Sequence, residues 1–176
     1  MSRAKKNTFS LRRASGASKV GLDAAIPTAQ TAITIAVDAD YIATLPPGTV
    51  HAGNGIYMMD NRLLNGSSNE GGLELSTVCP AGNLISFSAV LVNAESGNGS
   101  SVVITGFNVS QGSVFTAAGQ PRPFNPPPSG GATNSFWIGQ ALNQGKQTYQ
   151  IQIEVSIGVL QPVQYFISWD PFITAN

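Results

Sequence analysis

The residues able to carry chemistry are few in this chain. His51 is the only histidine and Cys79 the only cysteine, so a zinc site of the usual His/Cys type cannot be assembled. No Gly-x-Ser-x-Gly segment is present, which removes the sequence support for Ser–His–Asp hydrolysis. The segment Gly145-Lys146-Gln147 lacks the earlier glycine and the hydroxyl of a phosphate-binding loop. These patterns predict neither a metal nor a cofactor.

A pair of carboxylates is the remaining route to catalysis. Glu74, Glu95, Glu154 and Asp170 could in principle supply the acid and base of a glycosidase. Glu154, however, falls on the wet face of a regular predicted strand, and nothing in the spacing pairs the other three. The sequence therefore predicts that the protein is not an enzyme.

Two features suit binding rather than catalysis. The loop from Asn93 to Ser100 is rich in Asn, Ser and Gly, and its oxygens could hold calcium or a sugar. A plain Asn/Gly turn explains the same composition better. Trp137 and Trp169 could stack on a sugar ring, but both lie in alternating apolar runs, which favours packing in a core.

The elements that must position these residues are strands. In 147–157, Tyr, Ile and Val at odd positions alternate with polar residues at even ones, which indicates a strand with one buried face. The run 163–169 alternates in the same way, and Gly158 to Pro162 between the two predicts a hairpin loop. Further strands are expected at 31–37, 55–59, 72–78, 84–92, 101–109 and 134–142.

About eight short strands separated by turn signals predict an all-β fold, an antiparallel β-sandwich of jelly-roll-like type. One such domain is expected over residues 22–176. Its predicted core includes eight side chains at the buried phase of these runs: Ile85, Phe87, Tyr149, Ile151, Ile153, Val155, Ile167 and Trp169.

The segment 119–133 breaks this pattern because it holds five prolines. Proline cannot donate to a sheet ladder, so a long, extended crossover between the two sheets is expected here. The alternative is that this segment presents Phe124 to a partner.

Charge is scarce and unevenly distributed. Charged residues make up 10% of the 176 residues, and nine cations balance nine acids. A surface with so little repulsion between copies favours self-association, so a homo-oligomer is expected. The single cysteine allows no disulfide within the chain, and no run of about 18 apolar residues predicts a membrane span.

Residues 1–21 form a basic arm, defined by six of the nine cations: Arg3, Lys5, Lys6, Arg12, Arg13 and Lys19. No acid precedes Asp23, so the remainder of the chain carries a net charge of −6. The arm could contact nucleic acid, an anionic membrane surface or the acidic body of a neighbouring copy. The simplest interpretation is a flexible, solvated tail.

The C-terminal end resembles the closing motif of the PixA/AidA family of bacterial inclusion-body proteins. The resemblance rests on Tyr165, Phe166, Ser168, Trp169, Asp170 and Pro171, and on weaker similarities before them: Ile56 to Met59, Leu73 to Leu75, Cys79 to Asn83, and Ile85 to Phe87. It covers roughly residues 31–176 in order. Gly82-Asn83 and Ser86-Phe87 depart from the family pattern, which indicates a distant member.

This resemblance implies a β-sandwich without known catalysis that accumulates in cytoplasmic inclusions. For some members it also implies quorum-controlled expression and a host-associated life. Three functional hypotheses follow: a self-associating, non-enzymatic sandwich; a module binding carbohydrate or another surface ligand; and a small jelly-roll capsid protein whose basic arm holds RNA.

Overall fold

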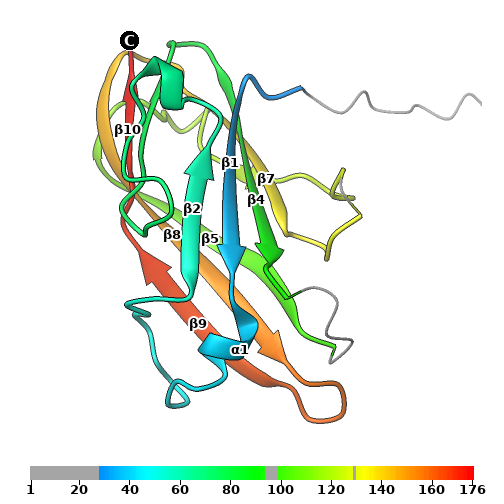
Figure 1. The fold of residues 1–176 in the computed structure, drawn as a ribbon. Coiled ribbons are helices and arrows are strands. Elements are labelled where there is room, and N and C mark those ends of the chain that lie inside the picture. Colours follow the sequence, from blue (N-terminus) through cyan, green and yellow to red (C-terminus); the bar gives the residue numbers. More distant parts are fainter. Residues whose placement is uncertain (1–27, 94–98, 129) are drawn as a thin grey trace, which may run out of the picture.

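Two sheets pack face to face in the computed structural model, which describes residues 28–93, 99–128 and 130–176 (Figure 1). Sheet A has the strand order β2-β1-β4-β7-β6, and sheet B the order β3-β10-β8-β5 with β9 also paired to β8. The strands of sheet A are β1 (Thr31–Val37), β2 (Ile56–Asp60), β4 (Leu84–Leu91), β6 (Arg122–Pro123) and β7 (Phe136–Gln140). Those of sheet B are β3 (Ser76–Cys79), β5 (Ser101–Gly112), β8 (Gly145–Ile157), β9 (Val163–Trp169) and β10 (Phe172–Ala175).

The only helices among the described residues are one short α-helix, α1 (Ala39–Ile42), and one 3-10 turn, Leu63–Asn65. Asp38 caps α1, because its carboxylate accepts a hydrogen bond from the Tyr41 backbone N–H. The expected all-β sandwich is therefore confirmed, with ten strands where about eight were predicted.

Both sheets are mixed rather than wholly antiparallel. β1 pairs parallel with β4, and β10 pairs parallel with β3. Parallel neighbours need a long connection, and here the chain between β1 and β4 passes through β2 and β3 before it returns. An alternating sequence pattern indicates which face of a strand is buried. It does not indicate whether the neighbouring strands run parallel or antiparallel to it, so these two pairs were not expected.

β8 lies in the interior of sheet B, and its alternating sequence matches an alternating burial of its side chains. Its odd-numbered side chains from Gln147 to Val155 are buried, while the even-numbered ones from Thr148 to Ser156 are half-buried on the outer face. All eight predicted core side chains are buried. The hairpin between β8 and β9 is also confirmed, with Ile157 opposite Val163.

An aromatic cluster fills the space between the sheets. Tyr149 stacks on Phe107 with ring centroids 4.9 Å apart, and Phe87 and Phe115 meet it edge-on at 5.8 and 6.0 Å. Phe87 belongs to sheet A and Tyr149 to sheet B, so this cluster joins the two sheets.

β9 and β10 follow one another along β8 (Figure 1), and they share one continuous register with it. The pairing runs without slip from Ile151 opposite Trp169 to Thr148 opposite Phe172. Between them, Tyr149 N–H donates to the carbonyl of Pro171 at 3.1 Å, whereas Pro171 has no N–H to return. The strand is interrupted only there, and past this point β10 pairs with β3 on its other side.

The proline-rich segment crosses from sheet B to sheet A, as expected. It leaves β5 and enters β7, and on the way Arg122 and Pro123 form β6 against β7. Phe124 is half-buried and its ring packs against Phe136, with centroids 6.2 Å apart.

Candidate interaction face

The outer face of sheet B is the most distinctive surface of the described residues. β8 contributes Thr148, Gln150, Gln152, Glu154 and Ser156 to it, a row with hydroxyl and amide groups and one carboxylate. Phe166 and Phe172 project onto the same face from β9 and β10 and are 55% and 40% exposed. The face is thus polar and almost uncharged, with two exposed aromatic rings.

Amide contacts hold the middle of this face. The Gln150 side-chain oxygen accepts hydrogen bonds from Asn108 Nδ2 at 3.2 Å and from Gln152 Nε2 at 3.3 Å. Gln152 lies over Gly106 at a bulge in β5, where a Cβ would collide with its side-chain oxygen. Glycine at this position therefore leaves room for the Gln152 amide.

Glu154 is also held by neighbours on the face. Its Oε1 accepts hydrogen bonds from Ser156 Oγ at 3.1 Å and from Gln164 Nε2 at 2.9 Å. It lies on the wet side of β8, as the sequence predicted, while Glu74 and Asp170 are exposed. Among the described residues no three or more His, Cys, Asp or Glu side chains gather to hold a metal ion.

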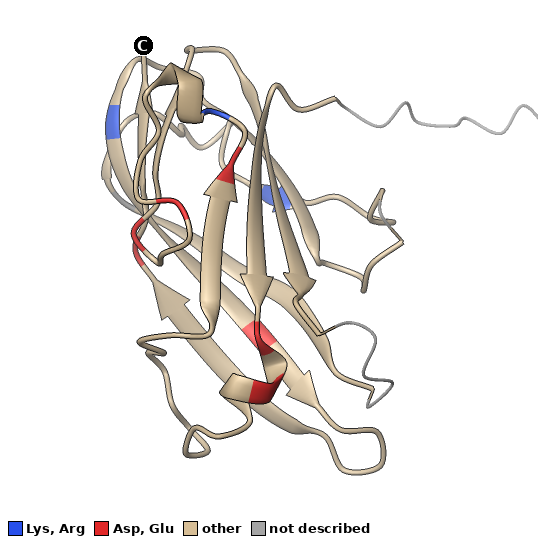
Figure 2. Ribbon diagram, in the orientation of Figure 1, with Lys and Arg blue, Asp and Glu red and all other residues tan. Residues whose placement is uncertain are grey.

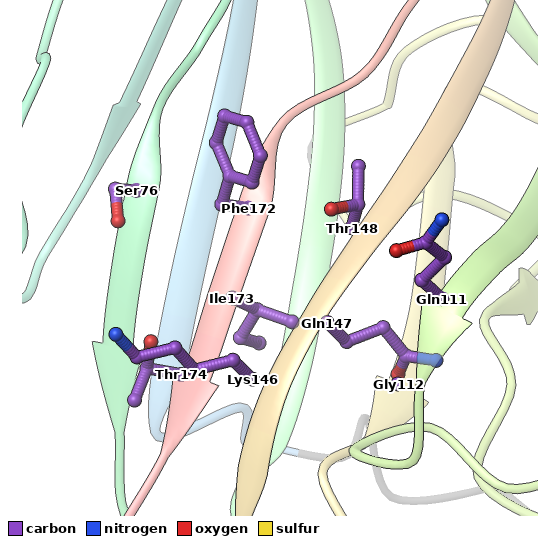
Figure 3. Close-up of a pocket in the computed structure, with 9 residues that line it drawn as sticks. All are labelled: Ser76, Gln111, Gly112, Lys146, Gln147, Thr148, Phe172, Ile173 and Thr174. Atoms are coloured by element: carbon purple, nitrogen blue, oxygen red, sulfur yellow. The ribbon is translucent and has the colours of Figure 1, made fainter.

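Phe172 lines a shallow groove of about 440 Å³. Figure 3 shows its ring beside the hydroxyls of Ser76 and Thr148, with Gln111 and Lys146 further along the groove. An apolar ring flanked by hydroxyl, amide and ammonium groups suits a polar ligand with one apolar face, such as a sugar ring.

A second, smaller hollow of about 230 Å³ lies beside Phe166. Val50, Thr105 and Gln152 line it together with β9. Ser168 also lines this hollow. The Ser168 N–H donates to the Val50 carbonyl at 3.0 Å, and His51 Nδ1 lies 3.1 Å from the Ser168 carbonyl oxygen. The single histidine thus contacts the end of a strand.

The C-terminal motif serves mainly the fold. Tyr165, Trp169 and Pro171 are buried, and Trp169 Nε1 donates to Met58 Sδ of sheet A at 2.9 Å. Asp170 is exposed at the turn between β9 and β10. Of the motif, only Phe166 presents a large apolar side chain to solvent.

The structure separates the other predicted binding residues. Both indoles are buried, so neither Trp137 nor Trp169 offers a stacking surface, and the core interpretation is confirmed. Asn93 Nδ2 donates to Asp40 at 2.6 Å and to Asp38 at 3.3 Å, while 94–98 of the same loop lie outside the described residues. The six cations of the basic arm also lie outside them.

Arg62 organises a polar cluster that no sequence pattern predicted. Its Nε donates to Thr31 Oγ1 at 2.9 Å, and its Nη2 donates to Asn83 Oδ1 at 2.8 Å and to the Gln30 carbonyl at 2.6 Å. Arg62 also donates its backbone N–H to Asp60 Oδ1 at 2.7 Å. The one feature of the sequence that could have pointed to Arg62 is that no other cation lies between Lys19 and Arg122.

Burial shifts the ionisation of groups near this cluster. It raises the pKa of the Cys79 thiol to about 11, opposed in part by the Arg62 charge. It also raises the pKa of Tyr149 strongly, with Asp60 adding to the effect. Desolvation raises the pKa of Glu70, which lies against Asp60. The shifts of Cys79 and Tyr149 do not favour a nucleophile, because they keep the thiol and the hydroxyl protonated.

Comparison with known families decides where the chain belongs. Residues 29–161 match the family described as Domain of unknown function (DUF8788). The chain belongs to this family. No curated protein matches the chain.

The solved structures place this DUF8788 member by fold. It is similar to the crystal structure of an inclusion body protein, PixA, from Burkholderia cenocepacia J2315, with a TM-score of 0.61. The two share 15% sequence identity, and the similarity covers 85% of this chain and 98% of the other. The likeness shows a shared fold. None of the helices in the described part is long and apolar enough to cross a bilayer.

Proposed function

We propose that this DUF8788 member is a non-enzymatic protein that acts by associating with copies of itself. The observation that carries the proposal is a surface with few charges and with large apolar side chains grouped on one hairpin. Val159, Leu160 and Val163 at the turn between β8 and β9 are exposed, and Phe166 follows them on β9. Exposed apolar groups gathered in this way mark interaction sites.

Sparse charge supports the proposal. The described residues hold seven acids and three cations, and Figure 2 shows how thinly they are spread over the ribbon. Little repulsion opposes the approach of two copies. The PixA structure that shares the fold is described as an inclusion body protein, which favours self-association and accumulation in cytoplasmic inclusions here as well.

The basic arm adds to the same proposal. Its +6 charge complements the −6 of the rest of the chain, so an arm can steer one copy toward the next. Exposed ion pairs contribute only about 0–1 kcal/mol each, so apolar and backbone contacts must supply most of the affinity.

Sedimentation of the full-length protein and of a variant lacking residues 1–21 tests this function. We expect both to associate as concentration rises, and we expect about 1 M salt to weaken only the contribution of the arm. A strictly monomeric full-length protein at high concentration and low salt would refute self-association. Nucleic acid that co-sediments with the full-length protein alone would favour the capsid hypothesis.

The groove around Phe172 supports a second candidate function, the binding of a carbohydrate. Its exposed ring and flanking hydroxyl and amide groups are the observation in its favour. Glycan-array binding that is lost in Phe172→Ala and retained in Phe166→Ala would support it. Equal binding by both variants would refute a site at this groove.

A further inference from the structure

The strand edges of a sandwich must be covered, because their unpaired N–H and C=O groups attract other strands. In sheet A, β2 is covered by the segment 66–75: Met58 N–H donates to Gly72 at 3.2 Å and Gly71 N–H to Met58 at 2.7 Å. The other edge of this sheet is β6, which consists of Arg122 and Pro123. An exposed cation and a proline both discourage strand addition.

The edge of sheet B at β3 is covered in the same manner, and the edge at β5 is covered in part. Ser68 and Ser76 exchange backbone hydrogen bonds of 3.1 and 3.0 Å along β3. On β5, the Ile104 N–H donates to the Asn134 carbonyl at 3.1 Å, and Gln120 Nε2 donates to the Phe107 carbonyl at 3.0 Å. The loop from β2 and the proline-rich crossover thus serve as covers.

β9 is the third edge of sheet B, and its register shows which groups point outward. Tyr149 N–H donates to Pro171, so the odd-numbered residues of β9 exchange bonds with β8. The even-numbered residues then direct N–H and C=O away from β8. Ser168 confirms this direction, since its outward N–H and C=O meet Val50 and His51.

Gln164 and Phe166 are the other two outward positions of β9. Within the described part of the chain, their backbone N–H and C=O groups have no hydrogen-bond partner. β9 also has no charged residue and no proline between Val163 and Trp169, so it lacks the devices that protect β6. Its side chains Val163 and Phe166 are exposed.

We propose that β9 is the surface on which a second copy of this chain docks, by antiparallel pairing of the two β9 strands. This inference rests on the proposed self-association and specifies its contact. Gln164 of each copy lies opposite Phe166 of the other, and a two-fold axis passes beside Tyr165.

This register satisfies both copies completely. Each copy offers two outward N–H groups and two outward C=O groups, and residues opposite each other in an antiparallel ladder exchange both bonds. The pairs Gln164–Phe166 and Phe166–Gln164 therefore use every unpaired group of both strands. If Gln164 lay opposite Gln164 of the other copy, Phe166 would face Pro162, which has no N–H. If Phe166 lay opposite Phe166, Gln164 would face Ser168, whose groups are already bonded.

The side chains also fit a copy of the same strand. An uncharged strand meets no like charge when it pairs with itself. On the outer face, Phe166 of one copy covers Gln164 of the other. At each end of the paired strands, Val163 of one copy lies near the C-terminal end of β9 of the other. The result is a sheet that continues from β5 of one molecule to β5 of the next.

Three variants test the contact by sedimentation over a range of concentrations. Gln164→Pro removes one outward N–H per copy, an N–H that the monomer does not use, and Phe166→Lys places a charge on the edge. We expect each to raise the dissociation constant roughly tenfold or more. Phe172→Lys is the matched control, because Phe172 is a similarly exposed ring on the same face, with its N–H donated to Leu75. It should leave the dissociation constant unchanged.

Cysteine cross-linking tests the register. Opposed residues of a bonded pair have Cα atoms about 5.5 Å apart, within disulfide reach. A mixture of the Gln164→Cys and Phe166→Cys variants should therefore give a disulfide-linked dimer under mild oxidation, and either variant alone should give far less. Native Cys79 is buried and does not compete.

The outcomes separate this inference from the proposed function. If the parent protein associates and Gln164→Pro, Phe166→Lys and Phe172→Lys all associate equally, the β9 contact is wrong and self-association stands. If Phe172→Lys alone dissociates, the outer face rather than the edge is the contact. If the parent protein is monomeric throughout, both proposals fail. Circular dichroism confirms that each variant is folded.

Discussion

The same substitution at two buried threonines should change stability in opposite directions. Thr31 and Thr77 are both fully buried on strands. Thr31 Oγ1 accepts from Arg62 Nε at 2.9 Å and donates to Asn83 at 3.1 Å, whereas Thr77 Oγ1 has no hydrogen-bond partner in the described structure. Valine keeps the shape of threonine and removes only the hydroxyl's bonding capacity.

The expected changes in the free energy of unfolding follow from the hydrogen bonds that each hydroxyl makes or lacks. A hydrogen bond to a charged group contributes about 1.5–3 kcal/mol, and Arg62 is only half-buried, so Thr31→Val should destabilise by about 1–2 kcal/mol. An unsatisfied buried polar group costs about 1–3 kcal/mol, so Thr77→Val should stabilise by about 1 kcal/mol. The two variants should therefore differ by roughly 2–3 kcal/mol.

Urea unfolding followed by circular dichroism measures this difference. With an m-value near 2 kcal/mol/M, 1 kcal/mol moves the midpoint by about 0.5 M, and the m-value itself should not change. If Thr77→Val destabilises as much as Thr31→Val, the Thr77 hydroxyl is hydrogen-bonded in solution and the prediction is wrong.

Three more predictions use the same assay. Ile153→Ala should cost about 2–5 kcal/mol because Ile153 is fully buried between the sheets, and a cost under about 0.5 kcal/mol would contradict its placement. Gly112→Ala should be strongly destabilising, since φ is +104° and a Cβ would collide with the Lys146 backbone carbonyl; a neutral result would contradict this backbone conformation at the end of β5. Stability should fall between about pH 9 and 11, where the unfolded chain loses the Cys79 proton and the folded chain keeps it, and Cys79→Ala should flatten this slope; an unchanged slope would contradict it.

The faces of the strands were predictable because burial follows the sequence period directly. β8 and β9 appear in the structure with the expected inward residues, and all eight predicted core side chains are buried. The crossover was predictable for an equally local reason, since proline cannot donate to a ladder. Each of these inferences needs only the residues of one segment.

The neighbours of the strands were not predictable from local patterns. The parallel pairs of β1 with β4 and of β3 with β10 join segments far apart in the chain. Arg62 and Phe172 were missed for the same reason. Arg62 acquires its role only where Thr31 and Asn83 meet it, and Phe172 lines a groove made by β3, β5 and β8 together.

The C-terminal motif shows how a recognisable sequence can serve the fold rather than a reaction. Trp169 ties β9 to Met58 of the opposite sheet, and Pro171 interrupts the ladder at the point where the chain leaves an edge and enters the interior of sheet B. Before Pro171 the strand has β8 on one side only, and after it β10 lies between β8 and β3. The motif therefore fixes the length of the uncovered edge, because it sets where β9 stops being an edge strand. A resemblance carried by these residues reports the fold, and the function that we propose depends on what this fold leaves unpaired at Gln164 and Phe166.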